Sequence, residues 1–111
     1  MIQLSDSPRA WGTDAFASTL KREVEALPPG ALPLDRAMAH GGRVDDGPVV
    51  VTVIGAIDAG SHLEARVGVF FAEVIAGCSC GDDPFDLPGY CELAGRIDKA
   101  TGITVFTLIP P

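Results

Sequence analysis

Two apolar segments joined by a short polar turn, between residues 49 and 71, constrain the fold of this chain more than any other feature. The segment 49–57 is rich in Val and Ile, and Asp-Ala-Gly-Ser at 58–61 has the composition of a turn. After the turn, apolar and polar or small residues alternate, which is typical of an antiparallel strand with one buried face. The apolar members of that alternation are Leu63, Ala65, Val67, Val69 and Phe71. We therefore predict a long β-hairpin, with the numbers of opposing residues adding up to about 119.

Apolar residues at helical spacing predict two helices. The first covers residues 13–27, begins at Thr13 and carries the stripe Phe16, Leu20, Val24 and Leu27. The second covers residues 89–101 and ends at Gly102, a favourable residue for a helix C-terminus. Its apolar face consists of Tyr90, Leu93, Ala94 and Ile97.

The remaining segments complete an α-β-β-β-α-β order. Residues 31–38 are predicted as a short edge strand, because Pro33 is unsuited to a central one. Residues 103–109 form a final strand, 39–48 and 77–88 form loops, and 1–12 form a loose N-terminal arm. Gly55, Gly68 and Gly77 are expected to mark bulges or bends in the long hairpin. The fold class that follows is α+β, a two-layer sandwich with a mainly antiparallel sheet and two helices on one face.

Length and charge narrow the class of protein. The chain has 111 residues, the size of one domain, and residues 1–111 contain no linker that would divide them. The net charge is −7 and the basic residues are scattered, which argues against nucleic acid and against anionic membrane surfaces as partners. No basic region precedes an apolar one at the N-terminus, so we expect a cytoplasmic protein. Arg outnumbers Lys and Asn is absent, a composition that suggests a GC-rich bacterial genome.

Three cysteines form the most distinctive chemical feature of the sequence. Cys78 and Cys80 lie in the run Gly-Cys-Ser-Cys-Gly at 77–81, and Cys91 follows in the first turn of the predicted second helix. In an extended chain, residues i and i+2 project to the same side, so the first two thiols could share one metal ion. A helix N-terminus lowers the pKa of a thiol, which makes Cys91 a candidate reactive cysteine.

The predicted pairing places residue 40 opposite residue 79, so His40 is a candidate neighbour of these thiols. Three thiolates and an imidazole are an accepted zinc set, and cysteines also bind iron–sulfur clusters. The spacing lacks paired Cys-x-x-Cys motifs, and free cysteine is commonly a small core residue. Three interpretations therefore remain open for Cys78, Cys80, Cys91 and His40: a zinc or iron–sulfur site, a thiol redox site, or core packing.

A third class of function comes from the outer side of the hairpin. Phe70 and Val74 lie on the face of their strand opposite to the predicted buried face. If no helix covers them, they form an exposed apolar patch. Such a patch suits a homodimer or another protein partner. No nucleotide-binding, hydrolase or metalloprotease motif is present in the sequence. The leading interpretation is thus a non-catalytic binding or interaction domain, with the metal and redox proteins as alternatives.

Overall fold

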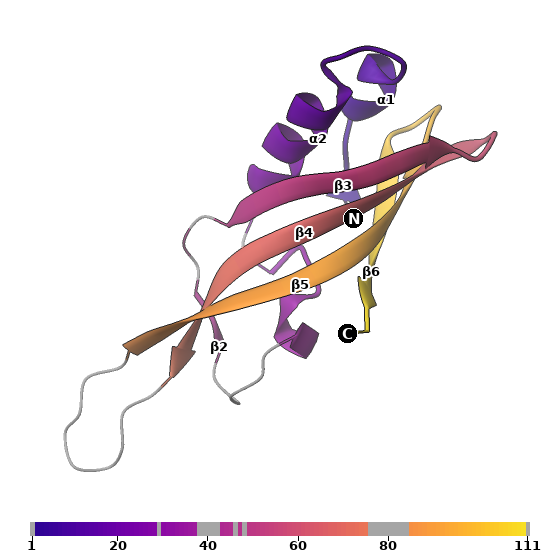
Figure 1. Cartoon of the computed structure of the whole chain (residues 1–111). Helices are drawn as coiled ribbons and strands as arrows, with labels where there is room; N and C mark the ends of the chain where they lie inside the picture. Colours follow the sequence, from indigo (N-terminus) through magenta and orange to yellow (C-terminus); the bar gives the residue numbers. More distant parts are fainter. Residues whose placement is uncertain are drawn as a thin grey trace, which may run out of the picture.

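The computed structural model describes residues 2–28, 30–37, 43–45, 47, 49–75 and 85–110. Helices α1 and α2 precede the long strands, and η1 is a short 3-10 helix (Figure 1). In chain order the elements are β1 (Ile2–Gln3), α1 (Ser7–Ala10), α2 (Phe16–Glu25), η1 (Leu34–Ala37), β2 (Arg43–Val44), β3 (Val50–Asp58), β4 (His62–Ile75), β5 (Phe85–Asp98) and β6 (Ile103–Ile109). The chain is therefore an α+β protein, as the sequence predicted.

Within the described residues, all the strands form one antiparallel sheet in the order β1-β6-β5-β4-β2, with β3 also paired to β4. Strand β4 is central: β5 lies along one edge over its whole length, while β3 and β2 share the other edge one after the other. The sheet is thus five strands wide. The β4–β5 pairing is the longest, from His62 opposite Asp98 to Ile75 opposite Phe85.

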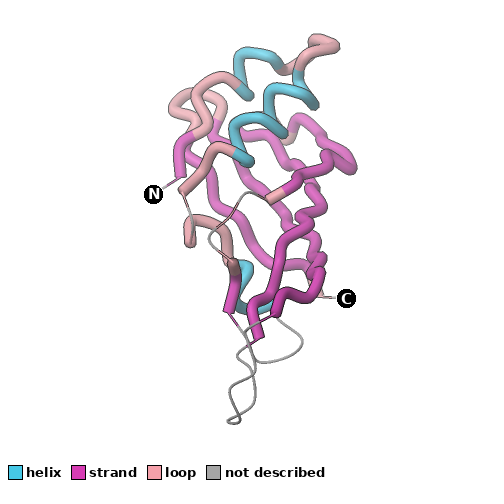
Figure 2. Tube along the Cα trace, turned by 90° about the vertical axis from the view of Figure 1, so that its left-hand side faces the viewer, coloured by secondary structure: helices cyan, strands magenta, loops and turns pink. Residues whose placement is uncertain are grey.

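The core lies between the helices and one face of this sheet. Phe16, Leu20 and Val24 of α2 are buried, which confirms three members of the predicted apolar stripe. The fourth, Leu27, follows the helix and is partly buried against the core. The three buried residues share one core cluster with the inward residues of β4, of which Leu63, Val67 and Val69 have no accessible surface. Figure 2 shows helices α1 and α2 at one end of the molecule, next to the strands. The part of the chain that is described contains no helix that is long and apolar enough to span a membrane.

Helix α2 begins at Phe16 and ends at Glu25, so it is shorter at both ends than the predicted helix over 13–27. The Thr13 side chain accepts a hydrogen bond from the Ala15 backbone N–H at 3.2 Å, so Thr13 stabilises the turn that leads into the helix. Trp11 packs against the core, with its ring edge-on to Phe16 at 5.0 Å between ring centroids. Residues 34–37 form η1, so the prediction of a strand over 31–38 was wrong.

The N-terminal residues are an integral part of the fold rather than a loose arm. Ile2 pairs with Thr104 at the outer edge of β6, and the Leu4 N–H donates to the Gly102 carbonyl at 2.8 Å. Leu4 is 1% exposed. Helix α1 is held by Glu23 of α2, whose carboxylate accepts hydrogen bonds from the Ser7 N–H and the Ser7 hydroxyl, both at 2.6 Å.

The predicted hairpin is present, with a register slightly different from the expected one. Val51 lies opposite Val69, one residue away from the predicted partner, and a register shift occurs between Val53 and Gly55. This shift confirms the bulge expected near Gly55. Gly68 continues the regular pairing, opposite Thr52 on one side and Glu92 on the other, so it marks no bulge.

The second predicted helix does not exist. Residues 85–98 form β5, and only the turn around Lys99–Gly102 separates it from β6. Leu93 and Ile97 are four residues apart, a spacing that satisfies both a helical face and one face of a strand. As a strand, this segment buries Cys91, Leu93 and Ile97 together on the inner face of the sheet. The final strand, β6, has the predicted bounds.

Aromatic rings cover three glycines of the sheet. A Cβ atom added at Gly95 would lie 2.7 Å from the Phe106 ring, and one at Gly89 would lie 2.5 Å from the Phe71 ring. Each of these glycines is directly opposite its aromatic partner. Gly68 is covered in the same way by Tyr90. The rings restore side-chain packing that a strand glycine cannot supply itself.

Candidate interaction surface

One side of the sheet is not covered by either helix. We call it the open face and define it by the outward residues of β3, β4, β5 and β6, which alternate with the core residues. Every exposed large apolar side chain among the described residues belongs to it: Val50, Ile54, Ile57, Phe70, Tyr90, Ile103 and Val105. Antiparallel sheets that face water on one side normally carry polar residues there. The open face departs from that pattern.

Phe70 and Tyr90 form a ridge on the open face. They are direct cross-strand neighbours on β4 and β5, and their rings are tilted by 43° with centroids 4.7 Å apart. Each is about half exposed, at 51% and 47%. The Tyr90 ring also lies over Gly68, which holds it against the sheet. Aromatic pairs of this kind combine a large apolar area with a fixed orientation.

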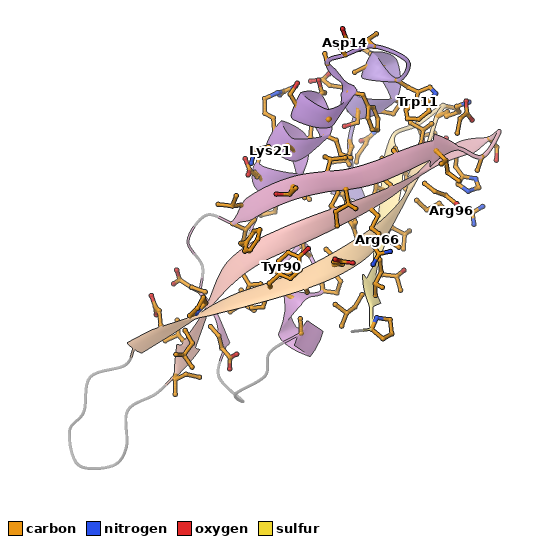
Figure 3. The ribbon with its side chains drawn as sticks, in the orientation of Figure 1. Trp11, Asp14, Lys21, Arg66, Tyr90 and Arg96 are labelled. Carbon is orange, nitrogen blue, oxygen red and sulfur yellow. The ribbon has the colours of Figure 1, made fainter. Side chains whose placement is uncertain are left out.

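A polar network lies beside the ridge (Figure 3). The Arg66 Nε donates to Glu92 Oε1 at 2.8 Å, Arg66 Nη2 donates to the same oxygen, and the Tyr90 hydroxyl donates to Glu92 Oε2 at 3.1 Å. The hydrogen bond from Arg66, supported by that from Tyr90, lowers the pKa of Glu92. Desolvation, followed by the bond to Glu92, raises the pKa of Tyr90. Glu92 is therefore ionised and Tyr90 is protonated at neutral pH.

A shallow hollow of about 570 Å³ lies next to the network. Its lining comes from β3, β4, β5 and β6 and includes the small residues Gly55, Ala94 and Gly95 beside larger ones such as Ile57, Arg66 and Val105. The small side chains leave room for the hollow. The open face thus carries a raised aromatic pair and a depression on the same strand, four residues apart.

The centre of the open face is electrically balanced. Its charged residues are Glu64, Arg66, Glu92 and Arg96, two of each sign, whereas the whole chain carries a net charge of −7. The negative charge of the chain therefore lies elsewhere. Charged groups at this site are also paired locally, as the Arg66–Glu92 ion pair shows.

The two residues predicted for this surface, Phe70 and Val74, both lie on it. Phe70 is exposed, and Val74 is half-buried between Arg43 of β2 and Asp86 of β5 in the pairing. Tyr90 was missed because the predicted second helix placed it in the core. The signal that would have identified Tyr90 as an outward residue is the alternation in this segment. Every second residue from position 90 to 98 points outward, and Cys91, Leu93 and Ile97 lie between them.

Of the four residues of the predicted metal site, only Cys91 lies within the described residues; Cys78, Cys80 and His40 lie outside them. Cys91 is on β5, opposite Val69, and is 7% exposed. It is not at a helix N-terminus, and burial raises the pKa of its thiol. The physical basis for a reactive, low-pKa Cys91 is thus absent. Within the described part of the chain, no three His, Cys, Asp or Glu side chains gather as metal ligands.

Cys91 also contributes to a second cavity of about 470 Å³, together with Tyr90, Leu108 and Pro110. This cavity lies where β6 ends, opposite Glu92, and β5 continues without it. Its walls are mainly apolar, and η1 contributes Ala37. Its lining also includes Glu92 and Arg66, and the Glu92 carboxylate is already bonded to Arg66 and Tyr90.

Comparison of the chain with protein-family models, with curated proteins and with solved structures gives no significant match.

Proposed function

We propose that this chain is a non-catalytic binding domain that holds a protein partner on the open face of its sheet. The observation that carries the proposal is the gathering of the exposed large apolar side chains on that one face. Contiguous exposed apolar area on a protein of this size is characteristic of interaction sites. Tyr, Phe and Arg, which dominate the centre of protein interfaces, occupy the centre of this one.

The chemistry of the open face supports binding rather than catalysis. Three of its central ionisable side chains, Arg66, Glu92 and Tyr90, bond to one another, so these groups hold a fixed arrangement in which the Glu92 carboxylate is already engaged. Phe70 and Tyr90 are the expected anchors, since rigid aromatic side chains lose little conformational entropy when they are buried.

Site-specific photo-cross-linking in cells that express the chain tests this proposal. A benzophenone amino acid is placed at Phe70 or at Val105, which lie on different strands of the open face, and at Ala17 on the exposed side of α2 as the matched control. We expect the two open-face positions to give an adduct with the same protein, identified by mass spectrometry, and Ala17 to give none. Absence of an adduct at both open-face positions, or an equal yield at Ala17, would overturn the proposal.

A further inference from the structure

We infer that two strands of the sheet are protected against the addition of another strand, β3 by Lys21 and Glu25 of α2, and β5 by Pro88. An unprotected edge strand presents a row of unpaired backbone N–H and C=O groups, and a strand of another chain can pair with them. The inference goes beyond the proposed function, because it concerns the edges of the sheet and not its open face. It is carried by the direction of the backbone groups and by the contacts that they make.

A hydrogen bond beside β4 shows which residues of its neighbours face outward. In an antiparallel pair, successive residues point their backbone groups alternately toward and away from the partner strand. The Ala72 carbonyl of β4 accepts from the Asp45 N–H at 2.8 Å, on the side of β2 and β3. Even-numbered residues of β4 therefore point their backbone groups to that side, and odd-numbered residues point theirs to β5. Val51 lies opposite Val69, so its own N–H and C=O face away from β4.

At Val51, two side chains of α2 take the place of a neighbouring strand. Glu25 accepts from the Val51 N–H and Lys21 donates to the Val51 carbonyl, both at 2.9 Å. A residue opposite Val51 in a further antiparallel strand would supply the same acceptor and the same donor. Lys21 and Glu25 also form an ion pair with each other, which keeps both side chains at this position. Another strand can pair with Val51 only after both side chains have left it.

A bulge limits the length of β3 that another strand could use. The register shift between Val53 and Gly55 interrupts the regular strand, and bulges are a common protection of sheet edges. Before the shift, β3 has two residues whose backbone groups face outward, Val51 and Val53. The side chains of α2 occupy the first of them. Removal of these side chains would therefore restore a continuous pairing edge from Val50 to the bulge.

Strand β5 is protected by a different kind of residue. Its pairing with β6 ends at Glu92, opposite Ile109, and within the described residues no other strand continues along that edge. Pro88 lies in this uncovered stretch, opposite Ala72 of β4. Because the Ala72 backbone points away from β5, the backbone nitrogen of Pro88 points away from β4, to the uncovered edge. Proline has no N–H, so it cannot donate to a strand added there.

Sedimentation velocity of the purified full chain under reducing conditions tests the inference, because a second copy is then the only source of another strand. We expect the Lys21→Ala/Glu25→Ala variant to self-associate at least tenfold more tightly than the wild type. Pro88→Val supplies an N–H in a good strand-forming residue, and we expect the same increase. Glu23→Ala is the control for lost stability, since Glu23 bonds to Ser7 of α1 and uncovers no strand edge. It is expected to sediment like the wild type.

Amide hydrogen exchange at Val53 identifies the surface through which the Lys21→Ala/Glu25→Ala variant associates. The Val53 N–H faces the same edge as that of Val51, so it should exchange more slowly when this variant is associated than when it is diluted to the monomer. Association without slower exchange at Val53 would overturn the inference. So would a variant of either edge that sediments like the wild type, or equal association of Glu23→Ala. Urea denaturation confirms that each variant is folded under the conditions compared.

Discussion

The Glu25 carboxylate accepts a hydrogen bond from the backbone N–H of Val51 at 2.9 Å, and Lys21, one turn earlier on α2, donates to the Val51 carbonyl at the same distance. Val51 belongs to β3, which forms an edge of the sheet, and its N–H and C=O point away from β4. Two side chains of one helix thus occupy the backbone groups that another strand would otherwise pair with. Exposed edges are sites of aggregation, and charged side chains beside them are a common protection.

We expect Glu25→Ala to lower the free energy of unfolding by about 1–3 kcal/mol, because the Val51 N–H loses its partner at a residue that is 1% exposed. Urea denaturation measures the change. Glu64→Ala is the control: Glu64 is exposed and, within the described residues, its ion-pair partner is the nearby His62 ring, so we expect less than about 0.5 kcal/mol. Equal losses in the two variants would contradict the proposed role of Glu25.

Stability is expected to decrease in acid, with a contribution from Glu25. The hydrogen bond from Lys21, followed by that from the Val51 N–H, lowers the pKa of Glu25 from its usual 4.5. A carboxyl whose pKa is lower in the folded state stabilises that state fully above the usual pKa, and the contribution disappears as the pH falls through the folded pKa. Thermal unfolding at a series of pH values should show a smaller loss below about pH 4.5 for Glu25→Gln than for the wild type. Parallel curves would exclude this contribution.

Glu23 is expected to be the residue that keeps α1 in place. Glu23→Ala removes the acceptor of the Ser7 N–H and hydroxyl, and Ser7 has no accessible surface, so we expect a loss of about 1–3 kcal/mol. The neighbouring Arg22 forms an ion pair with Asp6 in which both side chains are more than half exposed. Arg22→Ala should therefore cost less than about 0.5 kcal/mol. Chemical denaturation of both variants makes the comparison, and a larger effect at Arg22 would refute it.

The Gly95–Phe106 contact predicts a size-dependent substitution effect. Gly95→Ala places a Cβ 2.7 Å from the Phe106 ring, and we expect a loss of about 1–3 kcal/mol from overpacking. Gly55→Ala has open space around the new Cβ and is expected to be neutral or slightly stabilising. Phe106→Leu in the Gly95→Ala background should recover part of the loss. A double-mutant cycle with no coupling between the two positions would show that the ring is not the cause.

Cys91 is expected to react slowly with thiol reagents. Burial raises the pKa of its thiol, so the reactive thiolate is scarcer at neutral pH than in an exposed cysteine. Iodoacetamide labelling of the native protein, followed by peptide mass mapping, measures Cys91 separately from Cys78 and Cys80. Labelling should become rapid on denaturation. Rapid native labelling of Cys91 would restore the redox interpretation.

The sequence predicted those elements whose hydrophobic period has a single explanation. The alternation from Leu63 to Phe71 fits only a strand. The stripe Phe16, Leu20, Val24 and Leu27 fits only a helix, because the three-residue step from Val24 to Leu27 would change faces in a strand. Strand β5 was mistaken for a helix because Leu93 and Ile97 fit both periods, and because Gly95 interrupts the buried face. The gap at Gly95 is filled by Phe106, eleven residues later in the chain. A local pattern cannot contain that information.

The candidate surface was only partly predictable for the same reason. Phe70 could be assigned to the outer face because β4 was recognised, and its exposure confirms that position. Tyr90 and the hollow at Ala94 depend on β5 being a strand. The polar network depends on cross-strand pairing between Arg66 and Glu92, residues 26 positions apart. The metal prediction also depended on β5, since it placed Cys91 at the start of a helix.

The rings that lie over glycines also have a consequence for the divergence of this chain. The Phe106 ring fills the space where a side chain at position 95 would lie. A larger residue at 95 alone would therefore clash with the ring, and a smaller residue at 106 alone would leave a void. Drift at this point must therefore proceed in pairs, with a larger residue at 95 accompanied by a smaller one at 106. Among distant descendants of the same ancestor, we expect these two positions to covary even after the rest of the sheet has changed beyond recognition.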